Sequence, residues 1–112
     1  NLNTQEYHFP PSKTIADSIA VDIPRNFYMA QWYLLQYDGR ALKVSDDEIM
    51  EASLQMAKNY GLFAEPASAA AFAGFNRYYR QGKISQGTRV LILHTGSGLK
   101  DVSSAQKHLS IS

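Results

Sequence analysis

The apolar run at residues 90–93, Val-Leu-Ile-Leu, stands out in the hydrophobic pattern of the chain. A strand with one solvated face would alternate apolar and polar residues, so this run predicts a strand buried on both faces. Residues 95–98, Thr-Gly-Ser-Gly, follow it, and glycine permits a positive φ or a close approach of the backbone to a ligand. Because ligands of open α/β sheets bind beyond the carboxyl ends of the strands, this turn is a candidate ligand contact. A tight strand exit without a ligand is the alternative.

Residues 27–37 are predicted to form a helix, with Asn26 as N-cap and Gly39 ending it. Apolar and aromatic side chains occur on all sides of this helix. Such a helix is normally covered on most faces, so the pattern indicates a partner that covers it.

A second helix begins after Ser45, which forms a capping box with Glu48, and ends at Gly61. The acidic residues at its start are interpreted as helix-terminus residues and not as a metal site, because consecutive helical residues point in different directions. One face of the helix is predicted to be core, and it carries Ile49, Met50, Met56, Ala57 and Tyr60.

Pro66 occupies the first position of a third helix, which ends at the polar turn 80–83. Small residues repeat on one of its faces, which predicts tight packing on a sheet, with direct ligand contact as the alternative. These residues are Ala67, Ala70, Ala71 and Gly74. A short amphipathic helix is predicted over residues 100–108.

The remaining segments predict little regular structure. Residues 1–13 are an extended tail or linker, and residues 14–23 a loop followed by a short strand or irregular extended piece. Residues 40–44 fit a small strand or an extended link. Together these elements predict an α/β fold, with residues 14–112 forming part of a three-layer αβα domain. Its helices pack on an incomplete parallel sheet, whose other strands come from another copy or from residues absent here.

Composition excludes several functional classes. The chain is 45% hydrophobic, and its 11 Lys and Arg are scattered among 10 Asp and Glu, which gives no nucleic-acid patch. The absence of cysteine excludes disulfides and thiolate metal sites. The apolar runs are too short to span a membrane, so a cytoplasmic protein is the default interpretation. Asn1 is not an initiator methionine, which indicates a chain cut, processed or taken from something larger.

Residue types alone show no catalytic group. The three histidines match no metal-ligand spacing, and His94 is either a packing residue or a base. All lysines lie at polar turns or exposed helix positions, whereas a Schiff-base lysine needs a desolvated setting that lowers its pKa. In the loop at 14–18, Thr14, Asp17 and Ser18 either line a site or hydrogen-bond the nearby backbone.

Four motifs occur in a characteristic order: TIADSIAV, VSDDEI, GLFAEPASAAAFAG and VLILHTGSGLKD. With these separations they resemble the carboxyl-terminal part of pyridoxal-phosphate enzymes of the tryptophan-synthase β fold type, above all the threonine synthase family. The likeness runs from about residue 14 to the end. The first motif is also similar to threonine dehydratase, which remains the alternative within this fold type.

The resemblance implies pyridoxal phosphate as cofactor and a set of site residues. The Thr95 hydroxyl is expected to hydrogen-bond the pyridine nitrogen of the cofactor. Because this hydroxyl is neutral, it does not keep the pyridine nitrogen protonated. By the same resemblance Gly96 borders the ring and Glu65 approaches the cofactor and substrate. The substrate pocket is expected to be lined by Thr14, Ala16 and Asp17.

The resemblance also implies the reaction and its partners. Threonine synthases convert O-phosphohomoserine and water to threonine and phosphate. The family's Schiff-base lysine and phosphate-binding loop have no match here, so we expect the chain alone to be inactive and to need the amino-terminal part of the enzyme. We expect a homo-oligomer with a small amino-acid substrate and no nucleic-acid or membrane partner. A different class remains open, a non-catalytic module that self-associates through the helix containing Trp32.

Overall fold

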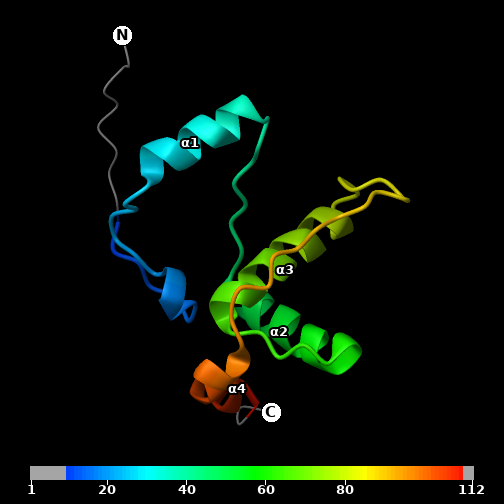
Figure 1. Ribbon diagram of the computed structural model, residues 1–112. Coiled ribbons are helices and arrows are strands. Elements are labelled where there is room, and N and C mark those ends of the chain that lie inside the picture. Colours follow the sequence, from blue (N-terminus) through cyan, green and yellow to red (C-terminus); the bar gives the residue numbers. More distant parts are fainter. Residues whose placement is uncertain (1–9, 110–112) are drawn as a thin grey trace.

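Helices α2 (Asp46–Tyr60) and α3 (Pro66–Arg80) pack against each other at the centre of the computed structural model, which describes residues 10–109 (Figure 1). Apolar side chains of the two helices form a small core with Ala16 of the loop before α1 and Ala64 of the segment before α3. The core residues are Ala16, Ile49, Ala52, Met56, Ala64, Ala69, Phe72 and Ala73. This two-helix unit is the platform on which the loops are placed.

The predicted start and end of α2 are confirmed. The Ser45 hydroxyl accepts a hydrogen bond from the Glu48 amide, and the Ser45 amide donates to the Glu48 carboxylate at 2.7 Å. Gly61 ends the helix in the left-handed conformation, with φ 68°. The predicted core face is right in part, because Ile49 is buried but Tyr60 is exposed.

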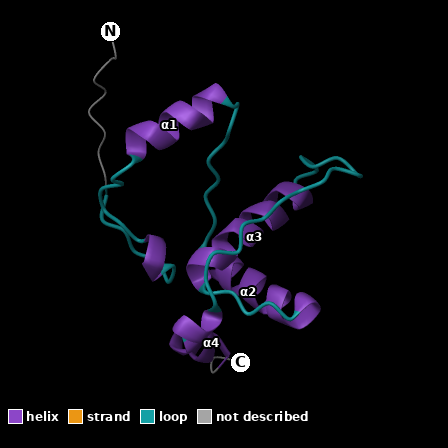
Figure 2. Ribbon diagram, in the orientation of Figure 1, coloured by secondary structure: helices purple, strands orange, loops and turns teal. Residues whose placement is uncertain are grey.

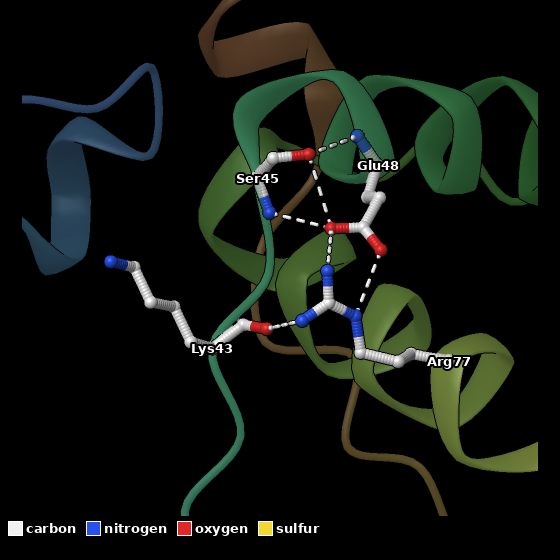
Figure 3. A network of polar contacts seen from close by, with 4 residues as sticks. All are labelled: Lys43, Ser45, Glu48 and Arg77. Carbon is white, nitrogen blue, oxygen red and sulfur yellow. Dashed lines mark hydrogen bonds and ion pairs between the residues drawn. The ribbon is translucent and has the colours of Figure 1, made fainter. Parts of the chain in front are cut away.

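Arg77 of α3 joins the start of α2 to the extended segment before it (Figure 3). Its Nε and Nη2 atoms donate to the two Glu48 carboxylate oxygens at 2.9 and 2.8 Å, and Nη1 donates to the Lys43 carbonyl. A planar guanidinium matches a carboxylate in this paired geometry. One arginine therefore holds three chain segments together.

This network predicts a pH-dependent stability. The Ser45 amide and the Arg77 guanidinium hold the pKa of Glu48 below its ordinary value of 4.5. Because folding favours the charged carboxylate, its contribution is complete at neutral pH and is lost as the pH falls below 4.5 toward the folded-state pKa. In urea unfolding at a series of pH values, Glu48→Gln should flatten the acidic part of the stability profile. Glu51→Gln leaves the network intact and should keep the wild-type profile; equal profiles for all three proteins would contradict the prediction.

The prediction of a buried strand at residues 90–93 is wrong for the described chain. This segment is extended but belongs to no strand, and the Leu91 side chain is 86% exposed (Figure 2). The physical reason is that a strand needs a neighbouring strand for its backbone groups, and the described residues provide none beside this run. Across residues 10–109 the structure is helical with connecting loops, and the expected sheet is not seen.

An apolar groove lies between residues 90–93 and the second extended segment, residues 40–44. The small-residue face of α3 forms its floor with Ala70, Ala71 and Gly74, and the volume is about 490 Å³. Figure 1 shows the segment of residues 90–93 running along α3, and residues 40–44 leading from α1 to the start of α2. The small residues thus face extended chain, but without the predicted sheet.

Helix α1 (Phe27–Gln36) is covered much less than its apolar sequence predicts. None of its residues is buried, and Trp32 is more than half exposed. Asn26 makes no side-chain cap, and Asp38 rather than Gly39 takes the positive φ after the helix, at 49°. The Gly39 amide instead closes the end of the helix on the Leu34 carbonyl.

Shorter helices complete the described chain. The loop at 14–23, predicted as irregular or as a strand, contains the 3-10 helix η1 (Asp17–Ile19), and η2 (Gly98–Lys100) precedes α4 (Val102–Leu109). The expected tail at 1–13 lies mostly outside the described residues. Within the described range no helix has the length and apolar character needed to cross a membrane.

Candidate functional site

The turn after residues 90–93 lies against the segment that leads into α3. The Gly98 amide donates to the Phe63 carbonyl at 2.8 Å, and the Glu65 amide donates to the Gly96 carbonyl at 3.1 Å. An isolated antiparallel bridge joins Ala64 to Ser97 between these bonds. The motif GLFAEPAS and the motif HTGSG, distant in sequence, therefore form one unit.

The two glycines of the turn permit close packing. A Cβ built on Gly96 would lie 1.8 Å from Oε1 of Glu65, and one on Gly98 would lie 2.7 Å from the Phe63 ring. Neither glycine has a positive φ. In the structure the two glycines thus permit a close approach of the backbone to the chain's own Glu65 and Phe63 side chains, and the expected approach to a ligand stays a prediction.

Glu65 is the carboxylate around which the predicted site residues gather. It is the N-cap residue of α3 but caps no amide with its side chain, and it is only 8% exposed. Its Oε2 atom accepts a hydrogen bond from Ser18 of η1 at 3.4 Å. The carboxylate is therefore held between η1 on one side and Gly96 on the other.

A polar pocket of about 470 Å³ opens beside Glu65, and Thr14 and Asp17 line it together with Ser18 and Lys100. The structure thus brings two of the three predicted substrate-pocket residues next to the predicted carboxylate. The third, Ala16, packs in the core instead of on the pocket wall.

Asp46, the first residue of α2, holds the loop that carries Thr14. Its carboxylate accepts from the Thr14 hydroxyl at 2.5 Å and from the Ile15 amide at 3.3 Å. The Thr14 hydroxyl oxygen also accepts from the Ala16 amide. The sequence predicts helix capping alone for the acidic start of α2, and no local signal indicates its contact with a loop about 30 residues earlier.

Thr95 is held through its backbone, and its side chain is exposed. The Thr95 amide donates to the Ser68 hydroxyl at 3.0 Å, and the same hydroxyl lies 2.9 Å from Nδ1 of His94. Thr95 does not line the pocket beside Glu65 but follows His94 at the end of the extended segment. In the sequence Ser68 is only part of a motif, and no local signal indicates these contacts.

The chemistry available at this site is that of binding and orientation. Ser68 and His94 resemble a nucleophile and base, but Ser68 is 2% exposed and its oxygen already accepts the Thr95 amide. The lysines are all exposed, including Lys100 at the pocket, so none lies in the desolvated setting that a Schiff-base lysine needs. Among residues 10–109 no three His, Asp or Glu side chains gather to hold a metal ion.

The site offers both a neutral hydroxyl and charged side chains to a small heterocyclic cofactor and its substrate. Thr95 offers an exposed hydroxyl, which can donate to a ring nitrogen without protonating it. The pocket beside Glu65 adds hydroxyl groups, a carboxylate and an ammonium, the groups that orient a charged small molecule.

Comparison with known proteins matches residues 2–96 to the model of the family described as pyridoxal-phosphate dependent enzyme. The chain is 34% identical over 99 residues to a threonine synthase of Halalkalibacterium halodurans, with 88% of this chain and 28% of that protein covered. It is 40% identical over 89 residues to a threonine synthase of Bacillus sp. strain ULM1, with 80% and 25% covered. For a threonine synthase of Methanocaldococcus jannaschii the identity is 38% over 93 residues, with 83% and 23% covered. The chain thus spans about a quarter of the length of these relatives.

Proposed function

This chain belongs to the family of pyridoxal-phosphate dependent enzymes, and from that premise we propose that it forms the ring-nitrogen side of the cofactor site in a threonine synthase-like lyase. The threonine synthase names of several relatives at 34–40% identity support this choice over a dehydratase. The complete enzyme would convert O-phosphohomoserine and water to threonine and phosphate.

The observation that carries the proposal is the unit formed by Thr95, Gly96 and Glu65. Gly96 bonds the Glu65 amide through its carbonyl, and Thr95 presents an exposed hydroxyl directly before it. The three residues that the family resemblance assigns to the cofactor are therefore neighbours in space, although Thr95 and Glu65 are 30 positions apart.

Each residue has a distinct role in the proposed site. Pyridoxal phosphate, when bound, supplies the electron sink for elimination and replacement at the substrate carbons. Thr95 binds the pyridine nitrogen and leaves it unprotonated, because a neutral alcohol does not stabilise a positive ring as a carboxylate does. Glu65 orients polar groups at the pocket, and Thr14 and Asp17 bind the polar part of the substrate.

The catalytic lysine and the phosphate-binding loop are proposed to lie in an amino-terminal part of the enzyme. The apolar groove between residues 40–44 and 90–93 supports this, because it offers two extended segments over the small-residue face of α3. Strands from that part would complete a three-layer αβα domain. They would also supply backbone hydrogen-bond partners for both extended segments. Relatives about four times as long as the matched region contain the necessary length.

The proposal predicts binding of the cofactor ring without covalent attachment. Deoxypyridoxine phosphate lacks the reactive aldehyde, so it tests the ring contacts alone. In a titration followed by NMR, the amide signals of Thr95, Gly96 and Glu65 should shift together and saturate. Thr95→Val should weaken binding about tenfold, because one hydrogen bond to the ring is lost.

Thr88→Val is the matched control, since Thr88 is also exposed but lies outside the unit. It should bind the analogue as the wild type does. The proposal is wrong if the three signals do not move at saturating analogue, or if both valine variants bind alike.

A second candidate is the non-catalytic module, and the exposed Trp32 side chain on α1 favours it. Trp32 is the chain's single tryptophan, so its fluorescence reports on α1 directly. If the chain self-associates through this helix, the emission maximum should shift to shorter wavelength as concentration rises, in step with dimer formation in sedimentation. An emission that stays constant while the chain remains monomeric would rule out this candidate.

A further inference from the structure

Ser68 is a buried hydroxyl with two partners on the extended segment opposite α3. Its oxygen lies 3.0 Å from the Thr95 amide nitrogen and 2.9 Å from Nδ1 of His94. Ser68 itself is in the first turn of α3, three residues after Glu65. One side chain therefore ties the helix start, the histidine ring and the Thr95 backbone together.

The hydrogen-bond inventory of these three residues favours one tautomer of His94. The Ser68 oxygen accepts from the Thr95 amide, so the hydroxyl proton is available for the second contact. Ser68 can donate this proton only if Nδ1 of His94 carries none, which places the ring proton on Nε2. The opposite tautomer would aim two donors at the Ser68 oxygen and leave the buried hydroxyl proton without its partner.

We propose that Ser68 is a positioning residue that locks His94 in the Nε2–H tautomer and fixes the Thr95 backbone, and so sets the orientation of the Thr95 hydroxyl. The value of this orientation for cofactor binding rests on the function proposed above. The hydrogen-bonded group of Ser68, His94 and Thr95, which we call the clamp, can be measured without any ligand. His94, which is exposed, then offers its Nε2–H to the solvent side as an additional donor.

The inference is tested by NMR of the nitrogen-labelled chain near neutral pH. Long-range spectra of His94 should show an unprotonated Nδ1 and a protonated Nε2, and the Thr95 amide should exchange slowly with solvent. Ser68→Ala removes the hydroxyl, so His94 should become a mixture of tautomers. The Thr95 amide should then exchange about tenfold faster, because its acceptor is lost.

Two further variants separate positioning from general stability. Ser68→Thr keeps a hydroxyl and should retain the Nε2–H tautomer. Ser53→Ala removes another serine hydroxyl that is 2% exposed and that donates to the Ala64 carbonyl at 2.8 Å, but it leaves the clamp intact. It should lower the stability while leaving the His94 tautomer unchanged.

An Nδ1–H tautomer in the wild-type chain overturns the inference without any variant, even if Ser68→Ala fails to fold. Unchanged His94 and Thr95 signals in a folded Ser68→Ala chain overturn it as well. Failure of the cofactor analogue to shift the Thr95 signal contradicts the proposed function instead, and leaves the tautomer result as it stands.

Discussion

Gly96→Ala is expected to destabilise the chain by about 1–3 kcal/mol and to displace the Glu65 carboxylate. The added Cβ would lie 1.8 Å from Oε1 and 2.3 Å from Cδ of Glu65, so the carboxylate has to leave its position. Glu65 is buried, and its displacement also breaks the contact with Ser18. Urea unfolding measures the loss of stability, and the chemical shifts of Glu65 and Ser18 report the displacement.

A double-mutant cycle isolates the steric cause. Glu65→Ala removes the clashing atoms, so adding Gly96→Ala to that variant should cost much less than it does in the wild type. Gly74→Ala is the matched glycine control, because its Cβ would lie 3.7 Å from Leu42, at ordinary contact distance. In a helix this change should be neutral or stabilise by up to about 1 kcal/mol. Additive effects of Gly96→Ala and Glu65→Ala would contradict the steric explanation.

Phe72→Ala is expected to have the largest effect on stability, about 3–5 kcal/mol. Phe72 is 8% exposed in the core between α2 and α3. Its ring stacks on Phe75 at 5.8 Å and meets Tyr60 edge-on at 6.3 Å. The alanine variant leaves a cavity that two short helices cannot close by small shifts. The free energy of unfolding from urea titration measures the loss.

Tyr79→Ala is the control for this prediction, because Tyr79 continues the same row of rings, 6.1 Å from Phe75, but is 64% exposed. It should cost far less than Phe72→Ala. Equal losses would show that ring stacking, and not burial, stabilises the helix pair.

Phe72 also matters for the candidate site. Asp46 on α2 holds the Thr14 loop, and Glu65 begins α3, so the relative position of the two helices sets the width of the pocket. The Phe72→Ala chain, where folded, should therefore show shifted signals for Thr14 and Glu65. A change in the core is therefore expected to change the pocket as well.

Local features of this protein were determined by the sequence alone. Ser45, Glu48 and Gly61 predicted both ends of α2, and Pro66 predicted the start of α3. These signals are local because a helix end leaves backbone amides or carbonyls without helical partners. Side chains within about four positions can supply the missing hydrogen bonds. For Gly96 the sequence left a positive φ and a close approach both open, and the structure shows a close approach to Glu65.

Only the tertiary structure decided which distant groups meet. Nothing in the local pattern indicates that Asp46 binds the Thr14 loop, or that Ser68 joins His94 to Thr95. The same holds for residues 90–93, whose apolar run predicts burial, while the described residues put no strand beside it. The apolar pattern indicates which side chains are more stable when removed from water. Whether they are buried, and whether their backbone groups are hydrogen-bonded, depends on which other segments pack against them.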